Sequence, residues 1–148
     1  MQFWHYTKMI AVPKILRDGE IKRTVTYFQG DRPCVWFSTN ENWDNGAGTL
    51  VQCDIGDIVS CDPVLLFGFG YGAIIPARIR LNPDAVKLIT WAEHQQTLPG
   101  WVAMRKELGG RLIVGANTAE WWVCYEDVPI KSCLLPIEKR VDGKWVAN

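Results

Sequence analysis

Short segments rich in aromatic and β-branched residues recur along this chain, and turn-forming residues separate them. Branched and aromatic side chains pack well on a pleated, half-buried surface, so such segments are typical of β-strands. An Asp142-Gly143 pair near the C-terminus is a strong signal for a hairpin. The pattern predicts strands at 2–6, 21–26, 34–39, 49–53, 58–61, 77–81, 86–91, 119–125 and 130–137.

Two segments are predicted to be helical. The first spans residues 8–18, with Thr7 as its N-cap and Gly19 as its C-terminal stop. Its buried side would consist of Ile10, Val12, Ile15 and Leu16. The second spans residues 97–108. A first helix directly after the first strand, in a chain made mostly of strands, indicates an α+β fold.

Length and charge limit the class of protein further. The 148 residues, 48% of them hydrophobic, suffice for a single domain, 1–148, with a sizeable core. Lys plus Arg and Asp plus Glu number 16 each, which argues against a protein that wraps a nucleic acid by charge alone. A neutral net charge is still compatible with a local basic patch.

Targeting signals and metal-ligand patterns are missing from the sequence. No apolar run approaches the roughly 18 to 20 residues of a membrane-spanning helix, and no signal segment opens the chain. The cysteines are odd in number and scattered without a C-x-x-C pair, so reduced thiols are the simplest interpretation. With His5 and His94 as the only histidines, no zinc-type spacing occurs. We expect a soluble, cytoplasmic protein with no membrane partner and no metal.

The predicted strand 119–125 reads AEWWVCY and places an acid among large rings. Alternation along a strand would point Glu120 to the same side as Trp122 and Cys124. A carboxylate beside apolar rings is costly to bury unpaired, so it lies either in water at a rim or in a site that uses it. In an arbitrary sequence the rim is the commoner place.

Two other features carry weight in the prediction. The segment ARIRL at 77–81 alternates, which predicts a half-exposed strand with Arg78 and Arg80 on one side. Eight tryptophans is a high number for this length. An indole has a wide flat face and one N–H donor, which suits stacking on planar rings, although core packing accounts for most tryptophans in proteins.

Three segments carry a resemblance to a known family. WHYT at 4–7 is followed by a predicted helix that contains ILRDGEI at 15–21, VWFST occupies 35–39, and AEW at 119–121 is followed by VPI at 128–130. In this order they resemble the opening motif, the second core strand and the glutamate-bearing segment of the ADP-ribosyltransferase-like superfamily. Among its members they are most similar to the DNA-targeting ADP-ribosyltransferase toxins.

The resemblance implies a split β-sandwich with few short helices and an NAD cleft between its sheets. It implies that Glu120 is the catalytic residue. Cleavage of the nicotinamide–ribose bond develops positive charge at the ribose carbon, and a carboxylate that accepts a hydrogen bond from the neighbouring hydroxyl stabilises that charge. Ser38 would position Glu120 from the adjoining strand.

The resemblance also implies which residues bind NAD. His5 would hydrogen-bond the ribose on the adenosine side. The backbone of Tyr6 or Thr7 would receive the nicotinamide amide. Trp36, Phe37 or Tyr6 would stack on the nicotinamide ring.

The implied activity is that of an NAD-dependent ADP-ribosyltransferase of toxin, defence or phage-encoded type. It would release nicotinamide from NAD and transfer ADP-ribose to a macromolecular acceptor, either nucleic acid or protein, and an antitoxin or immunity protein could bind its cleft. Thr118 stands where arginine-modifying relatives have Glu or Gln, which argues against arginine as the acceptor. Asn40 stands where the DNA-targeting toxins have a basic residue, which weakens transfer to a nucleobase unless an arginine reaches in from elsewhere.

Other classes of protein stay open. A catalytically silent module of the same fold could bind a nucleotide or a partner protein. A structural protein could use its tryptophans as an oligomer interface. Glu126 could replace Glu120 as the functional acid, and a cysteine nucleophile would need a base that only His5 or His94 could supply.

Overall fold

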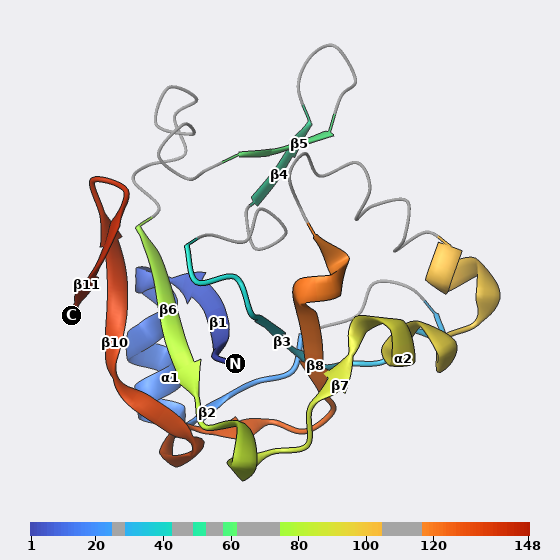
Figure 1. Ribbon diagram of the computed structural model, residues 1–148, viewed down its shortest axis with the longest axis horizontal. Coiled ribbons are helices and arrows are strands. Elements are labelled where there is room, and N and C mark those ends of the chain that lie inside the picture. Colours follow the sequence, from blue (N-terminus) through green and yellow to red (C-terminus); the bar gives the residue numbers. More distant parts are fainter. Residues whose placement is uncertain (25–28, 43–48, 53–57, 62–74, 105–116) are drawn as a thin grey trace.

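An antiparallel sheet of seven strands organises the computed structural model (Figure 1), in the order β11-β10-β6-β1-β3-β8-β7. Its strands are β1 (Phe3–Lys8), β3 (Val35–Ser38), β6 (Pro76–Leu81), β7 (Ile89–Thr90), β8 (Trp121–Cys124), β10 (Cys133–Val141) and β11 (Lys144–Ala147). The structure describes residues 1–24, 29–42, 49–52, 58–61, 75–104 and 117–148.

The remaining described elements are short. Two separate two-stranded sheets pair β2 (Glu20–Ile21) with β9 (Val128–Pro129) and β4 (Thr49–Gln52) with β5 (Ile58–Cys61). The helices are η1 (Met9–Ala11), α1 (Val12–Asp18), η4 (Pro83–Ala85), α2 (Trp91–Gln96), η5 (Thr118–Glu120) and η6 (Ile130–Ser132), and residues 100–104 are also helical. Among the described helices, none has the length and hydropathy needed to cross a membrane. The predicted α+β class, rich in strands and poor in helix, is confirmed.

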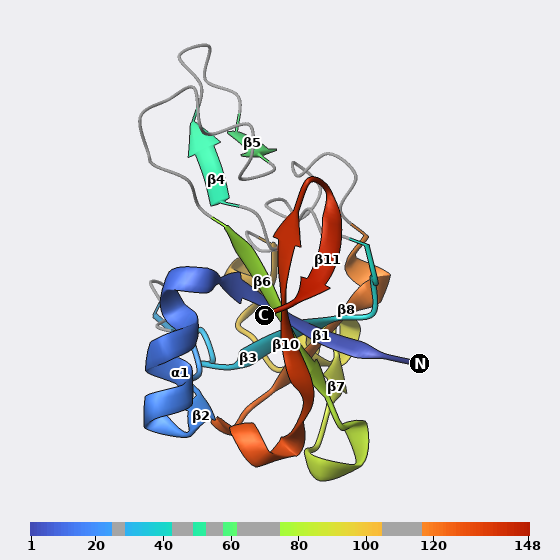
Figure 2. The same ribbon diagram turned by 90° about the vertical axis from the view of Figure 1, so that its left-hand side faces the viewer.

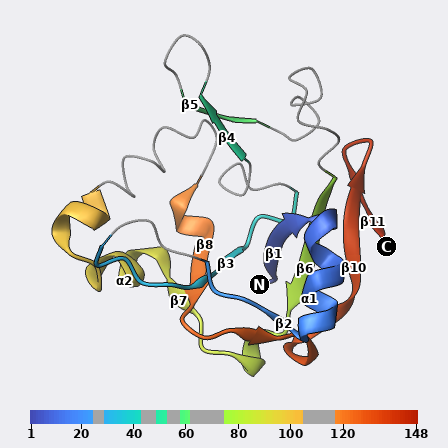
Figure 3. The ribbon, with the colours of Figure 1, turned by 180° about the vertical axis from the view of Figure 1, so that it is seen from behind.

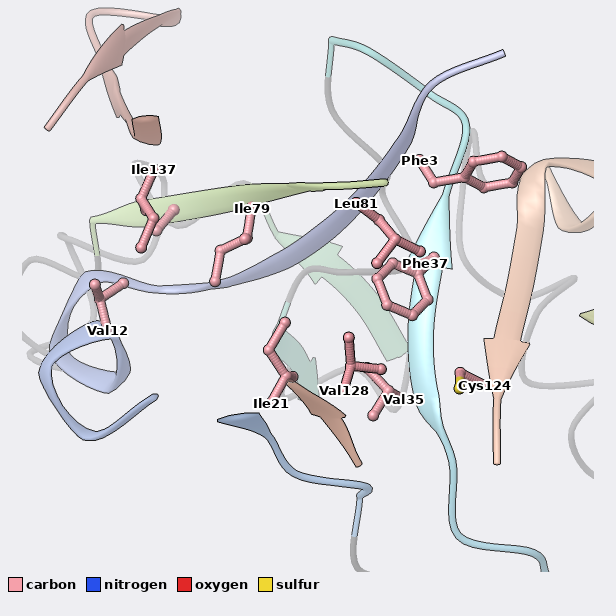
Figure 4. Packing of buried hydrophobic residues seen from close by; sticks show 11 residues of the cluster. Phe3, Val12, Ile21, Val35, Phe37, Ile79, Leu81, Cys124, Val128 and Ile137 are labelled. Carbon is pink, nitrogen blue, oxygen red and sulfur yellow. The ribbon is translucent and has the colours of Figure 1, made fainter. Parts of the chain in front are cut away.

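One face of the large sheet, here called the core face, carries the hydrophobic core. Alternate residues of β1, β3 and β6 point to it, and α1 together with the β2–β9 pair covers it, as seen from behind (Figure 3). Figure 4 shows how these side chains interlock. The fully buried members come from six different elements and include Val12, Ile21, Val35, Phe37, Ile79, Leu81, Cys124 and Val128.

The opposite face, here called the Trp4 face, combines rings with charged and polar groups. Residues directly opposite each other in an antiparallel pair point the same way. The register therefore aligns one row across four strands, Arg80–Trp4–Ser38–Trp121. A second row, Glu138–Arg78–Tyr6, runs beside it.

Strands β1 and β3 pair over a very short length. β1 pairs with β6 from Phe3 to Lys8, but with β3 only where Trp4 meets Ser38. Beyond that pair the two strands diverge, so side chains rather than a backbone ladder must join them.

The first helix begins later than the sequence predicts. Thr7 is not its N-cap, because β1 continues through Lys8 and a 3-10 turn precedes α1, whose N-cap is Ala11. Gly19 does end the helix, with the positive φ of 74° that glycine tolerates. The predicted buried side is right for Val12 and Ile15 and wrong for Ile10 and Leu16, which are 87% and 51% exposed.

Several predicted strand and helix boundaries are also wrong. Where a strand is predicted at 21–26, the structure has only the two-residue strand β2, which ends at residue 21. Residues 25–28 lie outside the described parts. The strand predicted at 86–91 is reduced to β7, because Thr90 forms a capping box with Glu93 and starts α2 there. Of the helix predicted at 97–108, residues 100–104 are helical and 105–108 lie outside the described residues.

The C-terminal part follows the prediction more closely. Asp142 and Gly143 make the turn of the β10–β11 hairpin, with φ angles of 49° and 75°. The hairpin stands at one edge of the large sheet (Figure 2). The strand predicted at 130–137 begins only at Cys133, since residues 130–132 form η6.

Candidate functional site

Glu120 lies at the end of a 3-10 turn and not inside a strand. The side chain of Asn117 caps the turn by accepting from the backbone N–H of Ala119 at 3.2 Å. The strand predicted at 119–125 is therefore shortened to β8, and Glu120 is its entry residue. The backbone N–H of Thr39 donates to the Glu120 carbonyl at 3.0 Å, which continues the β3–β8 pairing past Ser38.

Asn40 holds the carboxylate of Glu120. Its amide Nδ2 donates to Glu120 Oε2 at 3.1 Å. Its other amide atom, Oδ1, accepts from the backbone N–H of Asn42 at 3.0 Å. Because that position needs an acceptor, the network fixes which end of the amide faces the carboxylate.

The backbone of Asn40 is fixed as well. Its N–H donates to Ser38 Oγ at 3.2 Å, and its carbonyl accepts from the Tyr6 hydroxyl. Ser38 is thus linked to Glu120 through Asn40. Of the residues that the sequence predicts to form the site, Glu120, Ser38 and Tyr6 meet in one hydrogen-bond network, and Asn40 is its centre.

His5 lies on the core face, where it bridges the diverging strands β1 and β3. Its Nδ1–H donates to the Trp36 carbonyl at 2.9 Å, and its ring meets Phe37 edge-on at 5.9 Å. Burial lowers the pKa of His5 below its usual value, and the hydrogen bond to Trp36 opposes this shift without cancelling it. The ring is thus neutral near pH 7, and its Nε2 is an acceptor. Among the described residues, the Glu120 carboxylate bonds to Asn40 and not to His5.

The other predicted ligand-binding residues occupy three different surroundings. Phe37 is 2% exposed and packs in the core. Trp36, on the Trp4 face, packs against Trp91 and Trp121 with ring centroids 5.2 and 6.0 Å apart. Thr7, on β1, is half-buried and lies opposite Ala77 of β6. Of the three aromatic residues named for ring stacking, Tyr6 lies in the Asn40–Glu120 network.

An aromatic cluster attaches α2 to the Trp4 face. Trp91 and the buried His94 of α2 face Trp36, and His94 Nδ1 shares a hydrogen bond with the Tyr125 hydroxyl at 2.9 Å. The guanidinium of Arg32 lies 3.4 Å from the centre of the Tyr125 ring. We assign this cluster to packing, because its rings contact one another in edge-on and tilted geometries that stabilise cores.

Sequence reasoning missed a buried arginine beside the network. Arg78 is 8% exposed, so the prediction of a half-exposed strand is wrong, although the predicted alternation is right. Its Nε donates to Glu138 Oε2 at 2.6 Å, and its guanidinium stacks on Trp4 and Trp145 at 3.8 and 4.6 Å. The alternation of 77–81 predicts the direction of Arg78, but no local signal reveals that Glu138 and Trp145, from the C-terminal hairpin, contact its guanidinium.

Comparisons of the chain with protein-family models, with curated proteins and with solved structures find no match. The geometry of the Asn40–Glu120 network is therefore the evidence on which a function can be argued. Within the described residues, no group of three or more His, Cys, Asp or Glu side chains gathers to hold a metal ion.

Proposed function

We propose that the protein is an NAD-dependent ADP-ribosyltransferase with Glu120 as its catalytic residue. One observation carries the proposal. The segments 4–7, 35–39 and 119–121, which resemble three motifs of that family, belong to neighbouring strands or their ends, and Asn40 joins them at the carboxylate of Glu120. Segments so far apart in sequence have no local reason to meet at an acid.

The proposed reaction breaks the bond between C1′ of the nicotinamide ribose and the pyridinium nitrogen. The bonding electron pair leaves with nicotinamide, which neutralises its ring charge, and the acceptor nucleophile bonds to C1′ and releases a proton. Positive charge develops on the ribose before the new bond is complete. A carboxylate that accepts a hydrogen bond from the adjacent 2′-hydroxyl stabilises this charge where it appears.

The network suits Glu120 to that role. Among the described residues Asn40 is the partner of the carboxylate, through Oε2, and Oε1 would accept from a ribose hydroxyl. The Tyr6 hydroxyl donates to the Asn40 carbonyl, which places the Tyr6 side chain beside Asn40. A carboxylate held in one orientation before substrate arrives loses little freedom in the transition state.

His5 has a separate part in the proposal. It points to the core face while Tyr6 points to the opposite face, so in this proposal the ligand would reach His5 between β1 and β3, beyond their single pair Trp4–Ser38. The neutral His5 ring offers Nε2 as an acceptor for a ribose hydroxyl.

Nicotinamide release from NAD, measured with DNA, RNA and mixed protein as acceptors, tests the proposal. We expect release by the wild type and a loss of about a hundredfold or more in Glu120→Gln, which keeps the shape and removes the charge. Glu126→Gln is the matched control, since Glu126 is the exposed acid after β8, and it should keep full activity.

Two results would reject the assignment. If the wild type releases no nicotinamide with any acceptor, the enzyme proposal fails. If Glu126→Gln loses activity and Glu120→Gln does not, the catalytic acid is misassigned. NAD binding that raises the melting temperature equally in wild type and Glu120→Gln, with no product, would instead favour a silent nucleotide-binding module.

A further inference from the structure

The three consecutive backbone carbonyls of residues 40–42 each accept a hydrogen bond from a distant side chain. The Tyr6 hydroxyl on β1 donates to Asn40, and Arg78 on β6 donates to Glu41. Nε1 of Trp145 on β11 donates to the Asn42 carbonyl at 2.5 Å. We call Tyr6, Arg78 and Trp145 the carbonyl clamp. It fixes residues 40–42 from three strands of the sheet.

The members of the clamp also hold one another. The Arg78 guanidinium stacks on the Trp145 ring at 4.6 Å, and the rings of Tyr6 and Trp145 lie 5.7 Å apart. Glu138 on β10 pairs with Arg78 and sets the direction of its guanidinium fork. A planar guanidinium between rings and a carboxylate is more rigid than an isolated surface side chain.

The clamp controls what Asn40 can do. With its carbonyl held by Tyr6, its N–H by Ser38 and its Oδ1 by Asn42, Asn40 keeps one side-chain direction, toward Glu120. A movement of residues 41–42 would release Oδ1, and the amide could then turn away from the carboxylate.

We propose that Arg78 and Trp145, with Tyr6, are positioning residues that aim the Glu120 carboxylate through Asn40. The β10–β11 hairpin, far from β8 in the order of the sheet, thereby becomes part of the reacting site. The catalytic consequence rests on the proposed transferase function, whereas the structural link from Trp145 to Asn40 does not.

Trp145→Phe is the sharpest variant because it removes the indole N–H that binds the Asn42 carbonyl and keeps a smaller aromatic ring against Arg78. Trp101→Phe is the matched control, because it makes the same chemical change at a tryptophan that is 48% exposed, in the helical segment 100–104. For folded Trp145→Phe we expect kcat for nicotinamide release to fall about tenfold while KM for NAD stays within about twofold, as for a misaimed catalytic group. Arg78→Lys keeps the charge opposite Glu138 but not the fork, and it should lower kcat at least as much.

A second readout does not need activity. The Asn40 Nδ2 signals in a ¹⁵N–¹H spectrum, assigned with Asn40→Ala, should move when Glu120 becomes Gln. They should move again in Trp145→Phe and Arg78→Lys, and stay in place in Trp101→Phe. Circular dichroism verifies that each variant is folded, and either folded clamp variant suffices for the comparison.

The two proposals fail in different ways. If the wild type releases no nicotinamide, the transferase proposal fails and the Asn40 signals alone decide the clamp. If Trp145→Phe and Arg78→Lys leave the Asn40 signals and kcat at the values of Trp101→Phe, the clamp does not position Glu120 and the inference is overturned.

Discussion

Removal of the Glu138 carboxylate should expose the energetic cost of burying Arg78. The side chains of Arg78 and Glu138 are only 10% and 23% exposed, and Nε and Oε2 lie 2.6 Å apart. Breaking a buried pair by deleting one partner costs about 3 to 5 kcal/mol, because the remaining charge is left uncompensated. Arg78 keeps the Glu41 carbonyl and its stacking on Trp4, and this moderates the loss.

We therefore expect Glu138→Ala to lower the free energy of unfolding by about 2 to 3 kcal/mol. Glu138→Gln keeps an acceptor oxygen and should lose about 1 to 2 kcal/mol. For a chain of this length the Ala variant should melt roughly 5 to 10 °C lower. Urea unfolding followed by tryptophan fluorescence gives the free energies, and circular dichroism gives the melting temperatures.

Lys14→Ala is the control for this measurement. Lys14 pairs with Asp18 on α1, but its side chain is 64% exposed, so its loss should change the free energy of unfolding by less than about 0.5 kcal/mol. If Glu138→Ala changes stability as little as Lys14→Ala, Arg78 is not held as a buried ion pair, and the rigidity assigned to the carbonyl clamp is wrong.

Two further predictions use the direction of pKa shifts. Burial holds the pKa of His5 below that of an unfolded histidine, so the unfolded state binds the proton first as pH falls and the free energy of unfolding should decrease from about pH 6.5 downward. Replacing His5 by Gln should flatten that pH dependence in urea titrations at pH 5 to 7. An unchanged pH dependence would refute the lowered pKa of His5. Burial raises the pKa of the Cys133 thiol to about 11, so alkylation of Cys133 by iodoacetamide at pH 8 should be slow in the folded protein and fast in urea, whereas equal rates would show a reactive thiol.

The sequence predicts those features that depend on local periodicity. Alternation in 77–81 correctly separates Arg78 from the core residues Ile79 and Leu81. Asp142-Gly143 and Gly19 are right because positive φ is a property of single positions. Fold class follows from the same local signals.

Features that depend on the order of strands could not be predicted. Asn40 and Glu120 are 80 residues apart and meet only because β3 pairs with β8. Arg78 is buried because Trp4 and two residues of the C-terminal hairpin, Glu138 and Trp145, pack around its guanidinium. The 3-10 turn that takes Glu120 out of its predicted strand depends on a side-chain cap from Asn117, which propensity does not reveal.

The position of NAD relative to Glu120 tests the central claim most directly. A crystal structure of Glu120→Gln with bound NAD, in which turnover is slowed, should place the side-chain oxygen of residue 120 about 2.6 to 3.2 Å from the 2′-hydroxyl of the nicotinamide ribose, with Asn40 still beside it. NAD bound elsewhere on the chain, or bound with residue 120 out of reach of the nicotinamide ribose, would contradict the account.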